Sequence, residues 1–366
     1  MTSQVEGEVG ADAGAQQPRR MSWIGIDYFQ ALRHHKTIAA DDMRRIPANV
    51  NNILAIRYAP DGKQVAVSTA DGCMGIYSVA DGECLHFINK TASGSPATAL
   101  RFRGRPSSDA LTDVLVAVYT NGHIAEWNYR TGEKVRHLVE QDNQVLALDY
   151  NADSTTFATA GKDRVVRLYD EATGALVRTF EGHSNRVFAV RFGGDGSNVL
   201  LSGGWDDTVR VWDVRLPGAM STPGALFGPH VCGDAIDVDG QQVLTGSWAA
   251  SDTVQLWDLR TMAVVETLPY SSSMIYTAQF SKIGAPRIAV GGTKADEFRV
   301  FDRQAPHTAQ SELFQHKTDG TYSLDFSPAS QEVVAAGAGN VISVLDVKSG
   351  AYREFAAVGF RNVPKW

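Results

Sequence analysis

The sequence predicts an all-β fold built from seven similar units, each of four short antiparallel strands. Short runs that alternate apolar and polar residues recur along the chain, and clusters of Gly and Asp separate them. This pattern is typical of half-buried strands joined by tight turns. From about Ile53 onwards the unit recurs every 42 to 50 residues. Such a period predicts repeated strand units that stack on their neighbours in one domain.

The stretch from Gly182 to Asp213 shows the unit most completely. It reads GHSNRVFAVRFGGDGSNVLLSGGWDDTVRVWD, with strands expected at 187–192, 199–202 and 208–212. A Gly-His pair opens it and a Trp-Asp pair closes it. This stretch resembles one WD40 repeat, the four-stranded blade of a β-propeller.

The resemblance implies a buried hydrogen-bond chain within the blade. Its members here are His183, Ser202, Asp206 and Trp212. The indole N–H would donate to the hydroxyl, the hydroxyl to the imidazole, and the imidazole to the carboxylate, because each group is costly to bury alone. A Ser-His-Asp set also invites comparison with a protease, but the spacing fits the repeat and no nucleophile turn is present.

The number of units predicts a seven-bladed propeller. The third strand of each unit ends in an apolar or aromatic residue followed by a turn, and these ends are Tyr77, Trp127, Tyr169, Trp212, Trp257, Phe301 and Leu345. The third unit has no Gly-His pair before it, so we expect its hydrogen-bond chain to be incomplete. The fifth unit has His230 near the place expected for the histidine, and its turn carboxylate is displaced to Asp252.

The chain divides into four parts. Residues 1–21 predict a disordered tail, 22–52 a short N-terminal arm with a helix at 22–36, 53–356 the propeller, and 357–366 a C-terminal arm. The N-terminal arm could pack on the edge of the ring or anchor a partner. Either 349–355 or 43–46 could supply the outer strand of the last blade. We favour 349–355, because the DDMRR sequence around 43–46 is poor strand sequence.

Composition narrows the class of protein. The net charge of −7 argues against general nucleic-acid binding, since a phosphate backbone attracts a basic face. The three cysteines lack metal-ligand spacing and indicate free thiols in a reducing compartment, so we expect a cytoplasmic protein. No apolar run reaches membrane-spanning length, and the first 20 residues have no secretory apolar core.

The sequence shows no arrangement typical of catalysis. The Gly-rich stretch 336–340 lacks the strand-loop-helix setting of a dinucleotide site, the nine histidines are scattered, and no pair of carboxylates suggests a raised pKa. We therefore expect no enzymatic activity, cofactor, metal or small-molecule substrate. The resemblance instead implies a scaffold that binds proteins within a larger assembly. Related propellers occur in ciliary axonemes, ubiquitin ligases, chromatin complexes and trafficking coats, and we expect a cytoskeletal or ciliary assembly.

A second function is recruitment of substrates to a cullin-type ubiquitin ligase. The stretches 212–215 and 257–260 read Trp-Asp-Val-Arg and Trp-Asp-Leu-Arg, and both resemble the WDxR box of propellers that dock on such ligases. The resemblance implies that Arg215 and Arg260 present charge to the ligase adaptor. The alternative is that each arginine is only a solvated turn residue.

A third candidate site lies on one face of the predicted ring. Trp205 and Trp248 directly follow the second strands of adjacent blades, and Arg186 precedes the first strand of the earlier blade. Turns between second and third strands share one face of a propeller, and tryptophan is favoured at interface hot spots. The sequence therefore predicts a partner-binding patch there. The alternative is that both rings lie flat on neighbouring loops.

Overall fold

The computed structural model confirms an all-β propeller of seven four-stranded antiparallel blades. The structure describes residues 52–88, 94–104, 113–193, 198–216, 224–270, 274–284, 286–293, 297–303, 311–315, 320–337 and 341–357. All of them lie within one compact unit, Arg45–Trp366. The expected tail, nearly all of the N-terminal arm with its helix, and residues 358–366 of the C-terminal arm lie outside the described residues.

Each blade uses four consecutive strands, which run in order from the inside to the outside of the ring. The strands of blades 1 to 3 are β1 (Ile53–Tyr58), β2 (Gln64–Thr69), β3 (Met74–Ser78), β4 (Cys84–Ile88), β5 (Ala97–Phe102), β6 (Val114–Tyr119), β7 (His123–Asn128), β8 (Lys134–Val139), β9 (Val145–Tyr150), β10 (Thr156–Gly161), β11 (Val166–Asp170) and β12 (Leu176–Phe180). Those of blades 4 and 5 are β13 (Val187–Gly193), β14 (Val199–Gly204), β15 (Thr208–Asp213), β16 (Gly224–Phe227), β17 (Ile236–Asp239), β18 (Gln242–Gly246), β19 (Val254–Asp258) and β20 (Ala263–Thr267). Those of blades 6 and 7 are β21 (Ile275–Phe280), β22 (Arg287–Gly292), β23 (Glu297–Asp302), β24 (Ser311–Gln315), β25 (Thr321–Phe326), β26 (Glu332–Gly337), β27 (Val341–Asp346) and β28 (Tyr352–Ala356).

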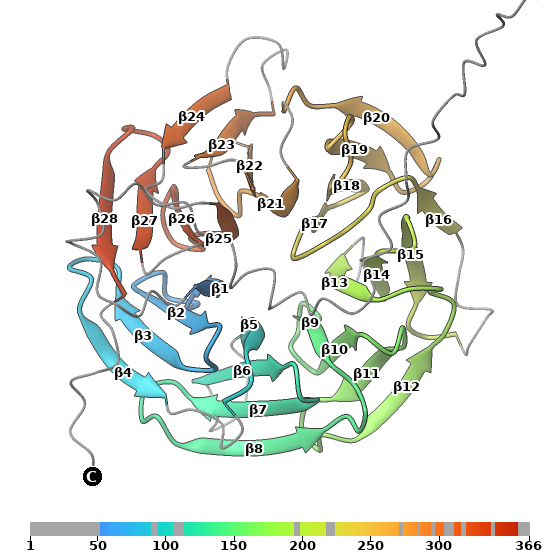
Figure 1. Cartoon of the computed structure of the whole chain (residues 1–366), viewed down its shortest axis with the longest axis horizontal. Coiled ribbons are helices and arrows are strands. Elements are labelled where there is room, and N and C mark those ends of the chain that lie inside the picture. The colour runs from blue at the N-terminus through green and yellow to red at the C-terminus, as the bar shows by residue number, and fades with distance from the viewer. Residues whose placement is uncertain are drawn as a thin grey trace, which may run out of the picture. The chain divides into compact units, whose positions relative to one another are not determined.

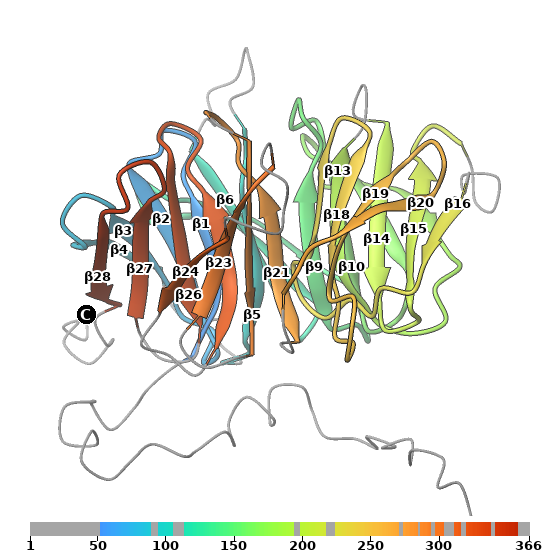
Figure 2. The same cartoon turned by 90° about the horizontal axis from the view of Figure 1, so that it is seen from above.

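The seven innermost strands are arranged around the central axis of the ring (Figure 1), and we call the region that they enclose, where their side chains meet, the central channel. Each contacts the innermost strand of the next blade, and β25 contacts β1, so the ring is closed. The strands run between two faces (Figure 2). We call the face with the turns between second and third strands, such as 205–207, the top face. The opposite face carries the turns between third and fourth strands, such as 214–216, and we call it the bottom face.

The hydrophobic core lies between blades rather than within one blade. One cluster joins Ala158 and Val166 of blade 3 to Val187 and Trp212 of blade 4. Alternation along each strand gives a blade two apolar faces, and each face is buried against a neighbouring blade. Trp212 is fully buried in this way. A blade is therefore stable only beside its neighbours, as expected for a repeat protein.

The last blade takes its outer strand from the C-terminal side, which confirms the strand that we favoured. The sheet of blade 7 has the order β25-β26-β27-β28, whereas 43–46 lies outside the described residues. Side chains hold blade 7 against blade 1. The amide of Ile56 donates to Ser323 Oγ over 3.1 Å, and Phe355 packs against Tyr77.

Candidate functional site

The structure brings together the four side chains of the hydrogen-bond chain expected in blade 4. The indole Nε1 of Trp212 donates to Ser202 Oγ over 2.7 Å. His183 Nε2 lies 2.7 Å from that hydroxyl, and His183 Nδ1 lies 2.8 Å from Asp206 Oδ2. Burial alone would raise the pKa of Asp206, but the hydrogen bond and charge of His183 outweigh it and lower the pKa to about 2. The chain ties β15 to the loop before β13, which is a structural role.

Blade 3 contains a hydrogen-bond chain after all, which corrects our expectation that it would be incomplete. Glu140 takes the place of the histidine and is buried. Its carboxylate accepts hydrogen bonds from the hydroxyls of Thr159 and Tyr169 and from Asn143 Nδ2, the last over 2.6 Å. Arg167 pairs with the same carboxylate at 3.1 Å. Glu140 lies five positions before the first residue of β9, and His183 lies four positions before the first residue of β13. This similar spacing could have identified Glu140 from the sequence.

Blade 5 retains only part of the chain, and the expectation for His230 was wrong. Trp257 Nε1 donates to Thr245 Oγ1 over 2.9 Å, as its counterpart does in blade 4. His230 instead turns toward blade 4, where its Nδ1 lies 2.6 Å from Asp207 Oδ1. The histidine thus belongs to the top face and not to the interior of blade 5.

The predicted top-face residues of blade 4 form a stack of rings. Trp205 is partly exposed, while the Nε1 atom of its indole ring is buried. The centroid of the ring lies 4.9 Å from that of Phe188 and 5.9 Å from that of His230, whose ring is nearly parallel to it at 16°. The guanidinium carbon of Arg186 lies 5.7 Å from the centre of the indole. A cation on an indole face is a favourable contact, so Arg186 and Trp205 form one unit.

Trp248 of blade 5 is linked to this stack through the backbone. Its amide donates to the carbonyl of His230 over 2.9 Å. The Trp248 ring meets Tyr276 edge to face with centroids 5.0 Å apart, and Tyr276 meets Tyr322 at the same distance. Trp248 is partly exposed, as Trp205 is. The aromatic side chains therefore form a row along the top of blades 4 to 7. We call Arg186, Trp205, His230 and Trp248 the top-face patch.

Arg215 and Arg260 occupy matching turns on the bottom face. Their side chains are 66% and 74% exposed. Each pairs with the aspartate of its own Trp-Asp sequence, at 2.6 Å for Arg215 and Asp213 and at 3.4 Å for Arg260 and Asp258. The hydrogen bond from Arg215 lowers the pKa of Asp213 to about 2. Both guanidinium groups remain open to solvent on one side, so they are available to a partner.

Charged side chains cluster in the central channel, and the sequence analysis missed this cluster. One equivalent position near the end of each innermost strand holds Arg57, Arg101, Asp149, Arg191, Asp237, Gln279 or Asp325. Guanidinium groups from blades 1, 2 and 4 converge on one further carboxylate, Asp234, in the loop before β17. Arg57 pairs with it from across the channel, Arg101 lies at 2.9 Å and Arg191 at 3.4 Å. The cluster therefore bridges blades that are not neighbours.

The other aspartates of the channel fasten neighbouring blades. Asp149, Asp237 and Asp325 accept hydrogen bonds from the backbone amides of Phe192, Phe280 and Tyr58, over 2.9, 2.8 and 2.8 Å. Each of these bonds crosses to the next blade in the ring. Lys282 adds an ion pair with Asp325 at 2.7 Å. Burial would raise the pKa of Asp325, but Lys282 and Arg57 outweigh it and lower the pKa. The charges are thus paired internally, which gives the cluster a structural role.

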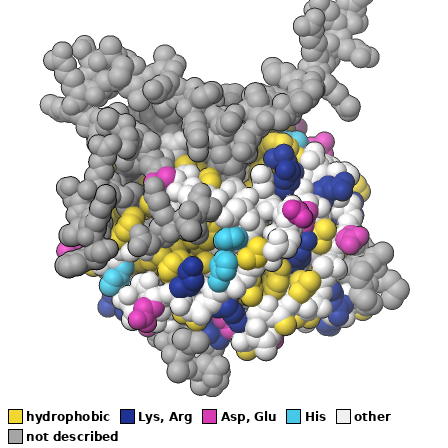
Figure 3. All heavy atoms as spheres, turned by 60° about the horizontal axis from the view of Figure 1, so that its bottom comes forward, with side chains coloured by type: hydrophobic (Ala, Val, Ile, Leu, Met, Phe, Trp, Pro, Cys, Tyr) yellow, Lys and Arg dark blue, Asp and Glu magenta, His cyan; other side chains and the backbone are white. Residues whose placement is uncertain are grey.

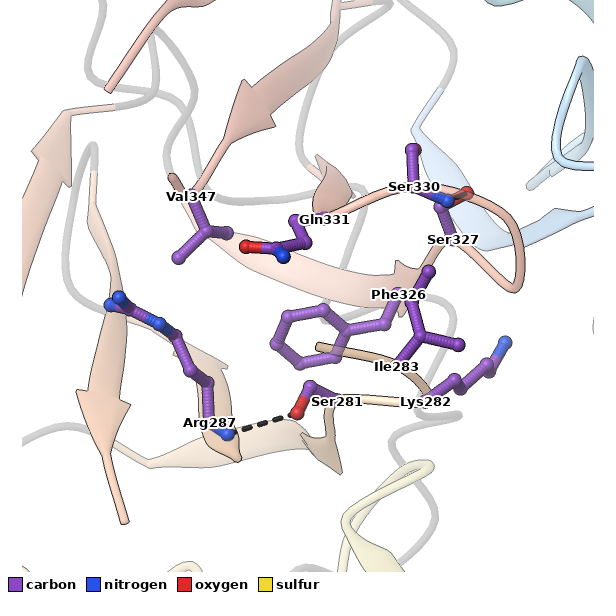
Figure 4. Close-up of a pocket in the computed structure, with 9 residues that line it drawn as sticks. All are labelled: Ser281, Lys282, Ile283, Arg287, Phe326, Ser327, Ser330, Gln331 and Val347. Carbon is purple, nitrogen blue, oxygen red and sulfur yellow. Dashed lines mark hydrogen bonds between the residues drawn. The ribbon is translucent and has the colours of Figure 1, made fainter. Parts of the chain in front are cut away.

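A small pocket opens on the bottom face between blades 6 and 7 (Figure 4). Its lining residues are Ser281, Lys282, Ile283, Arg287, Phe326, Ser327, Ser330, Gln331 and Val347. Its cavity of about 10 Å³ has room for one water molecule. The hydroxyl of Ser281 accepts a hydrogen bond from the amide of Arg287, so the polar lining is partly occupied by the protein itself.

The described residues include no group of three or more His, Cys, Asp or Glu side chains that could hold a metal ion. They also include no helix of the length and apolarity needed to cross a membrane. Cys73 and Cys232 are buried and Cys84 is exposed, and none of these three described cysteines forms a disulfide.

Comparison with known proteins matches the repeat architecture. A family model described as "WD domain, G-beta repeat" matches residues 132–170 and 174–213. The chain is 22% identical to periodic tryptophan protein 2 of Arabidopsis thaliana over 81% of its length, and 24% identical to autophagy-related protein 16 of the same plant over 70%. It is 22% identical to the APC/C activator protein CDH1 of Saccharomyces cerevisiae over 69%. It spans only 32%, 49% and 43% of the lengths of these three relatives. The chain thus contains WD40 repeats, at residues 132–170 and 174–213, and it folds as a seven-bladed β-propeller.

Proposed function

We propose that the chain is a non-catalytic scaffold that binds a protein partner through the top-face patch. The observation that supports this most directly is the placement of two partly exposed tryptophans, Trp205 and Trp248, on adjacent blades. His230 joins them, because its ring stacks on Trp205 and its carbonyl holds the Trp248 amide. Rigid aromatic side chains with a nearby arginine are the composition of binding hot spots.

Affinity purification from the source organism tests this proposal. We would compare the wild-type chain with a Trp205→Ala/Trp248→Ala variant and with Tyr352→Ala. Tyr352 is the matched control, because it is a 38% exposed aromatic residue at the bottom-face end of the outer strand β28 of blade 7, whereas the patch lies on the top face of blades 4 and 5. The double variant should lose its partner, while Tyr352→Ala retains it. The proteins recovered also test the expected cytoskeletal or ciliary placement.

A binding measurement with the recovered partner completes the test. Trp205→Ala alone should weaken binding by at least about 2 kcal/mol, or roughly 30-fold. Circular dichroism should show that the variant is folded. Equal recovery of the partner by the double variant and the wild type would contradict the proposal.

Docking on a cullin-type ligase is a second candidate function, favoured by the exposure of Arg215 and Arg260 on adjacent blades of the bottom face. The Arg215→Ala/Arg260→Ala variant should lose a cullin adaptor that co-purifies with the wild type. Arg130→Ala is the matched control, because Arg130 occupies the corresponding turn of blade 2 after Trp-Asn instead of Trp-Asp. If the wild type captures no cullin adaptor, this second function is excluded.

A further inference from the structure

Two histidine side chains meet at the edge of blade 2. His123 begins β7, the third strand of the blade, and His137 lies in the outer strand β8. Their ring centroids are 4.6 Å apart and the ring planes are inclined by 78°. His137 is exposed and His123 is partly exposed, so water and ions reach both rings. The face of the molecule in Figure 3 shows histidine side chains gathered near its middle, beside hydrophobic and basic ones.

The strand register explains why these two rings meet. His123 is directly opposite Val139, and His137 is opposite Ala125. The two histidines therefore occupy diagonal positions on the same face of an antiparallel pair, a spacing that large side chains can bridge. The backbone hydrogen bonds of two paired strands fix this arrangement, so the rings are brought together before any ligand binds.

The ring nitrogens of this pair are free within the described part of the chain. Neither ring donates or accepts a hydrogen bond there, and neither takes part in an ion pair. His183 of blade 4 is different, because one of its ring nitrogens is hydrogen-bonded to Asp206 and the other to Ser202. His230 also uses its Nδ1, toward Asp207. The nearest lysine on the same strand, Lys134, places its ammonium over the Trp127 ring at 5.0 Å.

The separation of the rings suits a shared metal ion. A divalent metal binds an imidazole nitrogen at about 2.0–2.1 Å, so two nitrogens on one metal lie roughly 3–4 Å apart. Ring centroids 4.6 Å apart allow nitrogens at that separation. Imidazole is a favoured ligand of Zn²⁺, Ni²⁺ and Cu²⁺, and Cu²⁺ binds a given nitrogen site most tightly.

We propose that His123 and His137 form a two-histidine site for a divalent transition-metal ion, with Cu²⁺ bound more tightly than Zn²⁺. No third His, Cys, Asp or Glu joins them among the described residues. Water fills the remaining coordination positions, so the site is open and exchangeable. It lies in blade 2, apart from the top-face patch of blades 4 and 5, and does not depend on the function proposed above.

Calorimetric titration of the whole 366-residue chain with Cu²⁺ and with Zn²⁺ tests the site. The variants are His123→Gln, His137→Gln and the double variant. His86→Gln is the matched control, because His86 also lies in the outer strand of a blade, in β4 of blade 1. Histidines elsewhere in the chain contribute equally to every titration, so the test is the difference between variants.

Each single substitution should weaken one binding step by at least about tenfold, since the chelate is lost, and His86→Gln should titrate like the wild type. Electron paramagnetic resonance of the chain loaded with one equivalent of Cu²⁺ should show fewer coupled nitrogens in each single variant. Circular dichroism confirms that the exposed substitutions leave the strands intact. If both single variants bind Cu²⁺ and Zn²⁺ as the wild type does, the proposal is overturned.

Discussion

Replacing Asp234 with asparagine should destabilise the ring, because three guanidinium groups from different blades depend on its carboxylate. Removing one partner of a buried ion pair costs about 3–5 kcal/mol. Arg101 and Arg191 keep a second carboxylate, Asp149, at 2.8 and 3.4 Å. Arg57 is 5% exposed and has no other carboxylate in contact among the described residues. We therefore expect the lower end of the range, about 3 kcal/mol.

Urea unfolding, followed by tryptophan fluorescence and by circular dichroism, measures this loss. Asp207→Asn is the matched control, because the side chain of Asp207 is 66% exposed and its loss should change the free energy of unfolding by less than about 0.5 kcal/mol. Salt screens buried charges little, so the difference between the two variants should persist at about 1 M NaCl. If Asp234→Asn unfolds at the same urea concentration as the wild type, the channel cluster does not hold the ring together.

Three further predictions concern the hydrogen-bond chains. Trp212→Ala should cost about 3–5 kcal/mol of unfolding free energy, because it leaves a cavity and removes the indole N–H that donates to Ser202 Oγ; a wild-type urea midpoint would contradict the assigned role. Glu140→Ala should cost about 2 kcal/mol and Glu140→Gln less, because only alanine leaves the Tyr169 hydroxyl without an acceptor; equal midpoints would argue against a chain in blade 3. The pKa of Asp206 is about 2, below its ordinary value of 3.8, so its stabilisation is present above about pH 4 and is lost as the pH falls through 2. The difference in unfolding free energy between wild type and Asp206→Asn should therefore shrink over that interval, and a constant difference would refute the assignment.

The fold could be predicted from sequence because its determinants are local and repeated. Each blade is four consecutive strands, so the alternation, the turns and the apolar or aromatic residue that ends the third strand lie within one stretch of the chain. The four residues from His183 to Trp212 were found for the same reason. The repeat pattern gave wrong expectations in blades 3 and 5, where the residues differ from those of blade 4. In blade 3 the expected histidine is absent, and Glu140 supplies the acceptor instead. In blade 5 a histidine is near the expected place but pairs with Asp207.

The channel cluster could not be predicted, because its partners are distant in sequence and belong to different blades. Arg57 and Asp234 are separated by 177 residues. A single arginine or aspartate near the end of a strand is ordinary sequence, and only closure of the ring places the seven strand ends around one axis. Charges of opposite sign in equivalent positions would have been a usable signal, had the innermost strands been aligned with one another.

The position of His230 makes the top-face patch more rigid. Because His230 turns toward blade 4, it fills the space between Trp205 and the loop that holds Trp248. Phe188, in the innermost strand β13, also packs against the Trp205 ring. A patch assembled from two blades and supported in this way loses little side-chain freedom when a partner binds. Its binding energy is then reduced less by ordering than that of a flexible loop, which is why truncation of a single tryptophan should have a large effect on affinity and a small one on stability.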